Sequence, residues 1–411
     1  KILQKEGHNN MARDRKAATE KRARWKTACI LFFCVLLLLY ILLVNFLVSA
    51  ALVPSFMEKL ESFERITEES YAAQVQTSDI KGNRQAALDE TNEWLKAAEH
   101  KKLSVETADG YTLVAQEFPA DEAEKIPAGQ DSSGAGGKAE KIATSQDSSG
   151  AGGGAEKIPA SEDSSGAGGG AEEIPVSQDS SSTGEKNHKW ALILHGYTGW
   201  KEEMYPFAYW YHEQGYHALV PDLRCQGESG GDFIGMGWTD SNDCILWINY
   251  ILSQDEDAQI VLHGQSMGAA TALMMSGREL PWNVQAVVSD CSYTDAYQMF
   301  GEKIKEWFHL PAFPLVDSAC LALRLRGGYD LKDASALEAV QKSRTPTLFI
   351  HGDSDAMISV QMSKELYEAA SCEKELLIVK GAGHGQAQEK DPETYFGTIR
   401  DFLDKTLESP K

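Results

Sequence analysis

One stretch of the chain is apolar without interruption and dominates the pattern of hydrophobic and polar positions. Residues 28–53 (ACILFFCVLLLLYILLVNFLVSAALV) contain no charged side chain. About 20 apolar residues in a helix cross a bilayer, whereas the apolar core of a cleaved signal peptide usually has about 7 to 15. The pattern therefore predicts a transmembrane signal-anchor helix over residues 27–53. The alternative is a secreted protein, released by signal cleavage near Ala50.

Residues 54–100 are polar and rich in Glu, Gln, Ala and Lys. This composition predicts a helical stalk that follows the membrane span. Near its end, Leu88, Trp94 and Leu95 recur at helical spacing, so we expect the last helix of the stalk to dock on a folded body.

A repeated segment of low complexity follows. Ala-Glu-Lys-Ile at Ala123 recurs with a period of 16 at Ala139 and Ala155, and as Ala-Glu-Glu-Ile at Ala171. Each repeat offers one Ile and no aromatic residue, which is too little apolar surface to offset the entropy of an ordered chain. We therefore expect residues 121–186 to be a disordered insertion between two core strands, because the cost of closing a loop grows only logarithmically with its length.

Residues 101–408, apart from this insertion, have the pattern of one α/β domain. Alternating apolar and polar runs flank Asp109-Gly110, which is a strong β-hairpin signal. Beyond them, short apolar runs alternate with helical periodicity, for instance over 243–252 and 267–276, and this predicts a mostly parallel sheet with helices on both faces. Residues 293–343 are too long for one crossover and predict a helical cap over the strand ends. The predicted strands are Trp190–Leu194, His217–Val220, Gln259–His263, Val284–Ser289, Thr347–Ile350 and Leu376–Val379.

Charge is distributed unequally about the apolar stretch. Residues 1–26 carry nine Lys and Arg against three Asp and Glu, a net charge of +6, although the formal net charge of the whole chain is −22. Because the basic flank of a membrane helix stays in the cytoplasm, we expect a cytoplasmic N-terminus and an extracellular remainder.

A chain with such a negative net charge would repel phosphates, which argues against nucleic acid as a partner. The chain begins with Lys1, and we expect translation to start at Met11.

The seven cysteines in 411 residues are too few, and odd in number, for a disulfide scaffold. Two of them, Cys29 and Cys34, lie in the apolar stretch, and the others form no Cys-x-x-Cys pair. Neither the cysteines nor the histidines cluster at the spacing of zinc ligands. We therefore expect no metal site, and the reaction inferred below requires no cofactor.

The segment IVLHGQSMGAA, residues 260–270, carries the candidate chemistry. It joins an apolar strand through Gly-x-Ser-x-Gly to a helix that opens with small residues. In such a turn the two glycines avoid Cβ clashes, and the serine hydroxyl stands at the positive end of the helix. This context predicts that Ser266 is a nucleophile.

A serine at neutral pH needs a general base, and the base needs an orienting carboxylate. In this architecture the chain order is Ser, acid and then His. His384 lies in a glycine-rich loop after the last predicted strand, so it is the predicted base. His351 is expected to be buried at a strand end, and His309 to pack within the cap.

Two aspartates follow the predicted strand Thr347–Ile350 closely. Asp355 is the predicted acid, because Asp353 is better placed to cap the turn. Asp290, at the end of the preceding strand, is the alternative acid.

The tetrahedral oxyanion of acyl transfer needs two backbone amides. Met267, directly after the nucleophile, is expected to supply one of them. The amide of Tyr197, in the loop after the first core strand, is expected to supply the other. His195 in the same loop is expected to hydrogen-bond that loop rather than act as a base.

Residues 101–120 and 187–408 resemble an α/β-hydrolase of the branch that includes serine-aminopeptidase-like and monoglyceride-lipase-like enzymes and many membrane-anchored bacterial hydrolases. The resemblance implies an α/β-hydrolase fold with Ser266 as nucleophile, Asp355 as acid and His384 as base, in agreement with the choices above. The usual Arg-Gly-His-Gly of the family is replaced by Arg224-Cys225-Gln226-Gly227, which alters a loop near the substrate pocket. The matching motifs are His195-Gly196-Tyr197, Pro221-Asp222-Leu223-Arg224, Gly264-Gln265-Ser266-Met267-Gly268, His351-Gly352-Asp353-Ser354-Asp355 and Gly383-His384.

Together these features predict a membrane-anchored extracellular serine hydrolase that cleaves carboxylic esters through an acyl-serine intermediate. Its partner would be a small ester or a short peptide substrate. A serine aminopeptidase would also need a carboxylate of the cap near the nucleophile, for which Glu302, Glu306 and Asp317 are candidates. The remaining alternative is a binding module on a hydrolase fold that has lost catalysis, which the complete set of Ser, Asp and His disfavours.

Overall fold

A sheet of nine strands organises the part of the chain that the computed structural model describes, which is residues 2–57, 77–120, 156–158 and 187–407. The strand order is β3-β1-β2-β5-β4-β6-β7-β8-β9. β5, β4, β6, β7, β8 and β9 pair in parallel, whereas β2 pairs antiparallel with both β1 and β5. The strands are β1 (Lys101–Glu106), β2 (Thr112–Phe118), β3 (Glu156–Ile158), β4 (Lys189–Leu194), β5 (His217–Pro221), β6 (Gln259–Gln265), β7 (Val284–Asp290), β8 (Thr347–Gly352) and β9 (Lys374–Val379).

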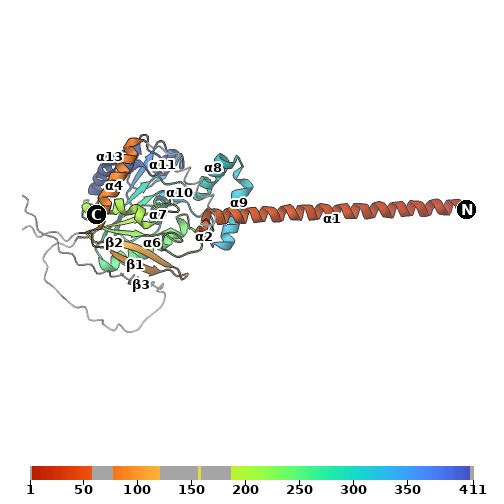
Figure 1. Ribbon diagram of the computed structural model, residues 1–411, viewed down its shortest axis with the longest axis horizontal. Helices are drawn as coiled ribbons and strands as arrows, with labels where there is room; N and C mark the ends of the chain where they lie inside the picture. Colours follow the sequence, from red (N-terminus) through yellow and green to blue (C-terminus); the bar gives the residue numbers. More distant parts are fainter. Residues whose placement is uncertain (1, 58–76, 121–155, 159–186, 408–411) are drawn as a thin grey trace, which may run out of the picture.

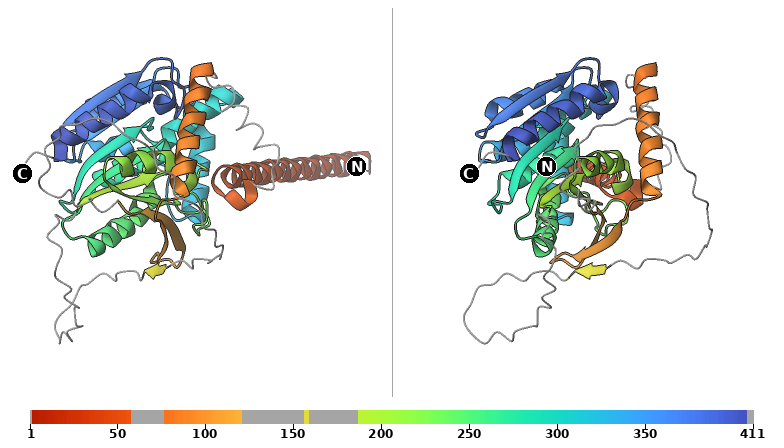
Figure 2. Two further views of the ribbon diagram at one scale, coloured as in Figure 1. Left: turned by 60° about the vertical axis from the view of Figure 1, so that its left-hand side comes forward. Right: turned by 90° about the vertical axis from the view of Figure 1, so that its left-hand side faces the viewer.

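Helices cover both faces of this sheet (Figure 2). α6, α7 and α11 pack on one face, and α5 and α13 pack on the other. This arrangement confirms the predicted α/β fold, in which a hairpin forms one side of a mostly parallel sheet. The helices are α1 (Ile2–Leu52), α2 (Pro54–Met57), α4 (Ser78–Leu95), α5 (Tyr205–Glu213), α6 (Trp238–Gln254), α7 (Met267–Ser276), α8 (Ala296–Phe308), α9 (Ala312–Arg326), α10 (Ala336–Val340), α11 (Val360–Ala369), α12 (Ala387–Lys390) and α13 (Pro392–Leu407), with a short 3-10 helix at Lys201–Met204.

Strand β4 illustrates why the apolar runs of the sequence become central strands. Leu192 and Leu194 join the core on one face, and Ala191 and Ile193 join the core on the other. Successive side chains of a strand point to opposite faces, so a strand that is covered on both sides needs a continuous apolar run. The six strands predicted from such runs are all present, with ends extended by up to two residues.

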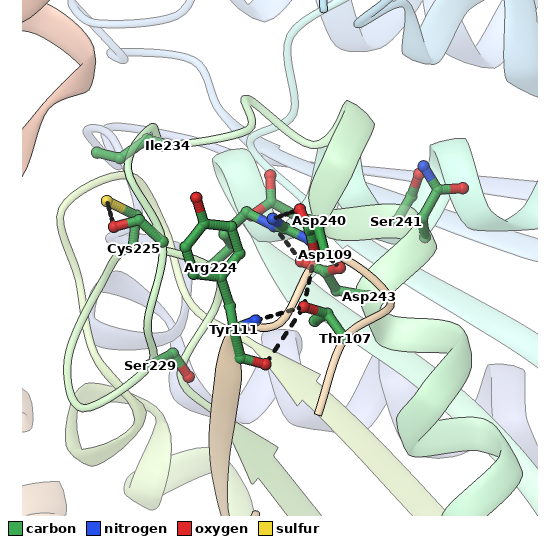
Figure 3. A network of polar contacts seen from close by, with 12 residues as sticks. Thr107, Asp109, Tyr111, Arg224, Cys225, Ser229, Ile234, Asp240, Ser241 and Asp243 are labelled. Carbon is green, nitrogen blue, oxygen red and sulfur yellow. Dashed lines mark hydrogen bonds and ion pairs between the residues drawn. The ribbon is translucent and has the colours of Figure 1, made fainter. Parts of the chain in front are cut away.

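The predicted hairpin at Asp109-Gly110 is confirmed, because β1 and β2 pair antiparallel around it and Gly110 has φ of +87°. The turn is fixed from outside by Arg224, as Figure 3 shows. The guanidinium of Arg224 donates to Asp109 at 2.5 Å and to both oxygens of Asp243 at 2.6 and 2.7 Å. It also lies 5.1 Å from the ring centroid of Tyr111. One side chain thereby joins the hairpin, the loop after β5 and helix α6.

Helix α1 projects from the body as a long rod with the N-terminus at its far end (Figure 1). Its section Arg24–Leu52 has 29 residues and contains an 18-residue stretch with a mean hydropathy of 3.0, so its length and composition suffice to cross a membrane. A signal sequence near the N-terminus would meet the same criterion.

Helix α4 lies against the body, as expected for the last helix of the segment predicted as a stalk. The guanidinium of Arg84 binds the carboxylate of Glu389 with bonds of 2.6 and 2.8 Å. Trp94 and Leu95 pack on the core as expected, but Leu88 is 41% exposed and does not dock. The remainder of the expected stalk, 58–76, lies outside the described residues.

The repeats and the cap have different outcomes. Most of the expected insertion at 121–186 lies outside the described residues, but Glu156–Ile158 forms β3 parallel to β1 and is therefore not disordered. Helices α8, α9 and α10 lie within residues 293–343, which are predicted to form the cap. His309 does not pack within the cap as expected, because it is exposed where α8 ends.

Asp240 is a fully buried acid in the first turn of α6. Its Oδ2 accepts a hydrogen bond of 2.8 Å from the amide of Gly237, which precedes the helix. Burial, together with the charge of Asp243, raises the pKa of Asp240 to about 7. A carboxyl group with a raised pKa in the folded state destabilises that state as the pH rises, because the unfolded chain releases the proton first.

We therefore expect Asp240→Asn to gain stability relative to the wild type as the pH increases from about 4 to about 7, with no further change above that range. Urea unfolding of the detergent-solubilised chain at several pH values measures the difference. Asp257→Asn, at an exposed position, is the control. A difference between Asp240→Asn and wild type that is independent of pH would contradict the prediction.

Candidate active site

Ser266 stands on a sharp turn between β6 and α7. Its backbone has φ of 56° and ψ of −116°, a conformation that non-glycine residues rarely adopt. The turn is possible because its flanking glycines have no Cβ. A Cβ on Gly264 would lie 2.2 Å from the carbonyl carbon of Gly268, and a Cβ on Gly268 would lie 2.1 Å from the carbonyl oxygen of Leu194. The serine hydroxyl is thereby held at the N-terminus of α7, over the carboxyl edge of the sheet.

His384 lies in the loop after β9 and joins Ser266 to Asp355. Its Nε2 is 2.8 Å from the Oγ of Ser266, and its Nδ1 is 2.7 Å from Oδ2 of Asp355. The side chains of His384 and Asp355 are almost fully buried, and Ser266 is 9% exposed. The structure thus brings together the three residues that the sequence predicts, in hydrogen-bonded series; their catalytic role stays a prediction.

The carboxylate of Asp355 is held on every side. Its Oδ1 accepts 2.8 Å hydrogen bonds from the amides of Met357 and Ile358, and its Oδ2 faces His384. Burial opposes ionisation, but the charge of His384 and the hydrogen bonds of His351 and His384 outweigh it, so the pKa of Asp355 is held well below its usual value. An ionised carboxylate in this position can stabilise an imidazolium on His384.

The alternative acid, Asp290, has other partners. Its Oδ2 accepts from the hydroxyl of Tyr395 at 3.1 Å and lies 3.4 Å from Nε2 of Gln265. Burial raises the pKa of Asp290 to about 6. Asp353 accepts a 2.6 Å hydrogen bond from the amide of Gly381, so it ties the turn after β8 to the loop that carries His384.

His351 has a contact that the sequence reasoning missed. It is buried at the end of β8 as expected, but its Nε2 lies 3.1 Å from Oδ2 of Asp355. Its Nδ1 is 2.6 Å from the hydroxyl of Ser363, so the ring is fixed from both sides. The spacing of four residues between His351 and Asp355 around a glycine is the signal from which this contact could have been inferred.

The loop after β4 lies directly against Ser266. A Cβ on Gly196 would be 3.4 Å from Cβ of Ser266, which places the neighbouring Tyr197 beside the nucleophile. Met267 is the first residue of α7, and the amides of the first helical turn have no acceptor within the helix. Both predicted oxyanion amides therefore lie in backbone that borders the serine.

His195 holds this loop, as expected. It is fully buried, its Nδ1 donates to the carbonyl of Gly196 at 2.7 Å, and its Nε2 accepts from the amide of Leu223 at 2.9 Å. Burial lowers the pKa of His195 to about 4, which favours the neutral ring that can both donate and accept. The loop after β4 is thereby joined to the loop after β5.

That second loop contains the altered motif Arg224-Cys225-Gln226-Gly227. Arg224 makes the ion pairs described above, and the thiol of Cys225 donates to the carbonyl of Gly231 at 3.2 Å. Gln226 is 5% exposed, and neither Oε1 nor Nε2 of its side chain has a hydrogen-bond partner among the described residues. Within the altered motif, Arg224 and Cys225 thus hold the loop through side-chain contacts, whereas the buried side chain of Gln226 does not.

One group of candidate metal ligands occurs among the described residues, and it is the site itself. Atoms of Cys291, Asp355 and His384 lie within 4.8 Å of one another. Both ring nitrogens of His384 already lie at hydrogen-bond distance from Asp355 and Ser266, so a cation there would have to break this series. Burial also raises the pKa of the Cys291 thiol far above its usual value, which disfavours the thiolate that metals bind.

Known proteins are similar to this region in sequence or in fold. The family model of the prolyl oligopeptidase family (Peptidase_S9) matches residues 204–410. The uncharacterized protein YqkD of Bacillus subtilis (strain 168) is 29% identical over 219 residues, which cover 53% of this chain and 72% of YqkD. The uncharacterized protein YfhR of Escherichia coli (strain K12) is 25% identical over 226 residues, or 54% of this chain and 72% of YfhR.

The structure of the Pyrococcus furiosus esterase Pf2001 is similar in fold, with a TM-score of 0.50 and 17% identity. The similarity covers 76% of this chain and 94% of the esterase. At this level of identity the likeness concerns the fold alone.

Gly268→Ala tests the close approach on which the turn at Ser266 depends. The added methyl group would meet the backbone of β4, which cannot withdraw without moving the sheet. We expect a loss of about 3 kcal/mol in the free energy of unfolding. Gly397→Ala in α13, where nothing lies within 4 Å of the added Cβ, is the matched control and should be neutral or stabilising. Equal stability of the two variants in urea unfolding would contradict the packing argument.

Proposed function

The chain belongs to the prolyl oligopeptidase family, within the α/β-hydrolase superfamily, and is a serine hydrolase; from this premise we propose that it hydrolyses carboxylic esters at Ser266. The observation that carries the proposal is the series of hydrogen bonds from Ser266 through His384 to Asp355, at 2.8 and 2.7 Å. Similarity of the motifs to the serine-aminopeptidase-like and monoglyceride-lipase-like branch agrees with this choice.

In the proposed mechanism His384 takes the proton of Ser266 as the serine oxygen attacks the ester carbonyl. The amides of Tyr197 and Met267 bind the oxyanion of the tetrahedral intermediate, and Asp355 stabilises the imidazolium. Collapse of the intermediate breaks the bond to the alcohol, which leaves with the proton of His384. Water then attacks the acyl-serine in the same way and releases the acid.

The cap carboxylates favour an ester over a peptide with a free N-terminus. An aminopeptidase would need one of them to receive the substrate ammonium group. Glu306 already accepts from Nζ of Lys303 at 2.6 Å, and Asp317 from Nζ of Lys332 at 3.0 Å. Glu302 accepts from the side-chain Nε2 of Gln298 at 3.0 Å. All three carboxylates are thus engaged with neighbours on the cap.

We further propose that α1 is an uncleaved anchor, with its N-terminus in the cytoplasm and the hydrolase outside the cell. Val44 and Val48 near the end of α1 are 4% and 3% exposed and belong to the core of the body. Signal cleavage near Ala50 would remove both side chains from that core and expose the surface that they cover. The contacts therefore favour the anchor over the secreted alternative.

A fluorophosphonate probe tests the catalytic role of Ser266. We expect the detergent-solubilised wild type to be labelled and Ser266→Ala to remain unlabelled, whereas Ser253→Ala, at an exposed position of α6, should label normally. Asp355→Asn should label more slowly by several orders of magnitude, because the imidazole loses its orienting charge. An unlabelled wild type that is folded would favour the non-catalytic binding module.

A panel of p-nitrophenyl esters of increasing chain length, measured beside aminoacyl p-nitroanilides, tests the substrate class. We expect kcat/KM for the best ester to exceed that for the best anilide, because the candidate carboxylates Glu302, Glu306 and Asp317 are each engaged with a neighbouring side chain. Faster turnover of aminoacyl anilides would instead identify a peptidase, the activity that the family name suggests. Ser266→Ala is the control for each substrate.

A further inference from the structure

Exposed apolar side chains gather on the cap. Outside α1, eight large hydrophobic side chains are exposed among the described residues, and five of them lie on α8, on α9 or in the corner between these helices. We call these five the cap patch. They are Phe308 (57% exposed), Leu310 (48%), Phe313 (73%), Leu321 (56%) and Leu325 (78%). Such clustering marks a surface that contacts something apolar.

The cap patch adjoins the outer end of α1. Helix α9 runs across α1 close to the body (Figure 1). The hydroxyl of Tyr40 lies 2.9 Å from that of Ser318, and the guanidinium of Arg326 donates to the hydroxyl of Ser49 at 2.9 Å. The seam between the two helices is therefore closed by specific contacts as well as by the buried side chain of Val44.

The direction in which part of the patch faces follows from this seam. Ser318, Leu321 and Leu325 are spaced by three and four residues, so they share one side of α9. Ser318 reaches Tyr40, which lies farther from the body than Ser49 along α1. That side of α9 consequently faces along α1 toward its N-terminus, away from the sheet.

The length of α1 places this side of α9 at the edge of the bilayer. The last charged residue before the apolar stretch is Lys26. At 1.5 Å per residue, a hydrocarbon layer of about 30 Å takes about 20 residues, and these end near residue 46. Tyr40 and Ser49, which contact α9, lie on either side of that point.

We propose that the cap patch rests in the outer leaflet of the same bilayer that α1 spans, so that the cap is a second membrane contact of the enzyme. The inference rests on the proposed anchoring by α1. The continuity of the patch with the seam argues for lipid as the occupant, because a helix that lies across a membrane span at the interface immerses its apolar side. The other occupant to be tested is a second copy of the chain.

The contact also reaches the active site. The hydroxyl of Tyr197, whose amide is a proposed oxyanion donor, donates to the carbonyl of Ala51 at the end of α1. The amide of Ile234 donates to the carbonyl of Leu52 at 2.9 Å. A cap seated on the bilayer would therefore hold the loop over Ser266 at a fixed distance from the lipid surface.

Photo-crosslinking in liposomes tests the proposal. The full chain is reconstituted in phosphatidylcholine and phosphatidylglycerol vesicles with a photo-crosslinking amino acid in place of Phe313, Leu325, Leu38 or Trp282, one at a time. We expect lipid adducts at Phe313 and Leu325 and none at Trp282, which is 62% exposed but lies outside the cap. Lipid adducts at Leu38 alone, or adducts to a second copy of the chain from the cap positions, would overturn the proposal. No adduct at Leu38 would show instead that the anchoring by α1 is wrong.

The double variant Phe313→Ser with Leu325→Ser gives a second readout. We expect its turnover of a soluble p-nitrophenyl ester to match that of the wild type, whereas its turnover of a long-chain ester embedded in the vesicles falls about tenfold. Trp282→Ser should leave both rates unchanged. Equal loss on the two substrates would mean that the substitutions damage the enzyme itself, and no loss on either would overturn the membrane contact.

Discussion

The structure depends on the close approach of three backbone segments at the end of β6. Gly264, Gly268 and the carbonyl of Leu194 lie so near one another that no Cβ fits between them. Because of this approach, Ser266 occupies a strained turn from which its hydroxyl points out over the sheet edge rather than into the core. The loops after β4, β8 and β9 end at the same edge, since parallel strands deliver their carboxyl ends together. The residues proposed for the reaction therefore lie together at one edge of the sheet.

Burial and the local hydrogen-bond donors together determine the protonation states of the buried His and Asp side chains. His195 is fully buried, and its lowered pKa favours the neutral imidazole. In this form the ring hydrogen-bonds both the loop after β4 and the loop after β5. Asp355 is sequestered as well, but two amides and two imidazoles surround its carboxylate, so its pKa falls instead of rising. Asp290 and Asp240 also accept hydrogen bonds, but these do not outweigh burial, and both pKa values are raised. The same physical cause, loss of water, thus yields opposite protonation states according to the donors that replace it.

The C-terminal end of α1 is packed into the body. Its side chains belong to the core of the body, and its last carbonyls accept hydrogen bonds from Tyr197 and Ile234. The helix is consequently part of the fold that positions the loop beside Ser266, and the apolar cap surface lies next to it. A hydrolase anchored as proposed would meet its substrate at the boundary of a lipid phase.

The sequence by itself determined six parallel strands, the hairpin, the apolar span and the order of Ser266, Asp355 and His384, because each leaves a local pattern of periodicity or a turn motif within a few residues. It did not determine β3, which lies in the segment expected to be disordered. It did not determine that Arg84 of α4 binds Glu389, or that Leu88 and His309 stay exposed. Nor did it contain any signal that Arg224 clamps the hairpin or that Tyr40 meets Ser318. These contacts join side chains whose surroundings come from distant parts of the chain, so only the tertiary structure could decide them.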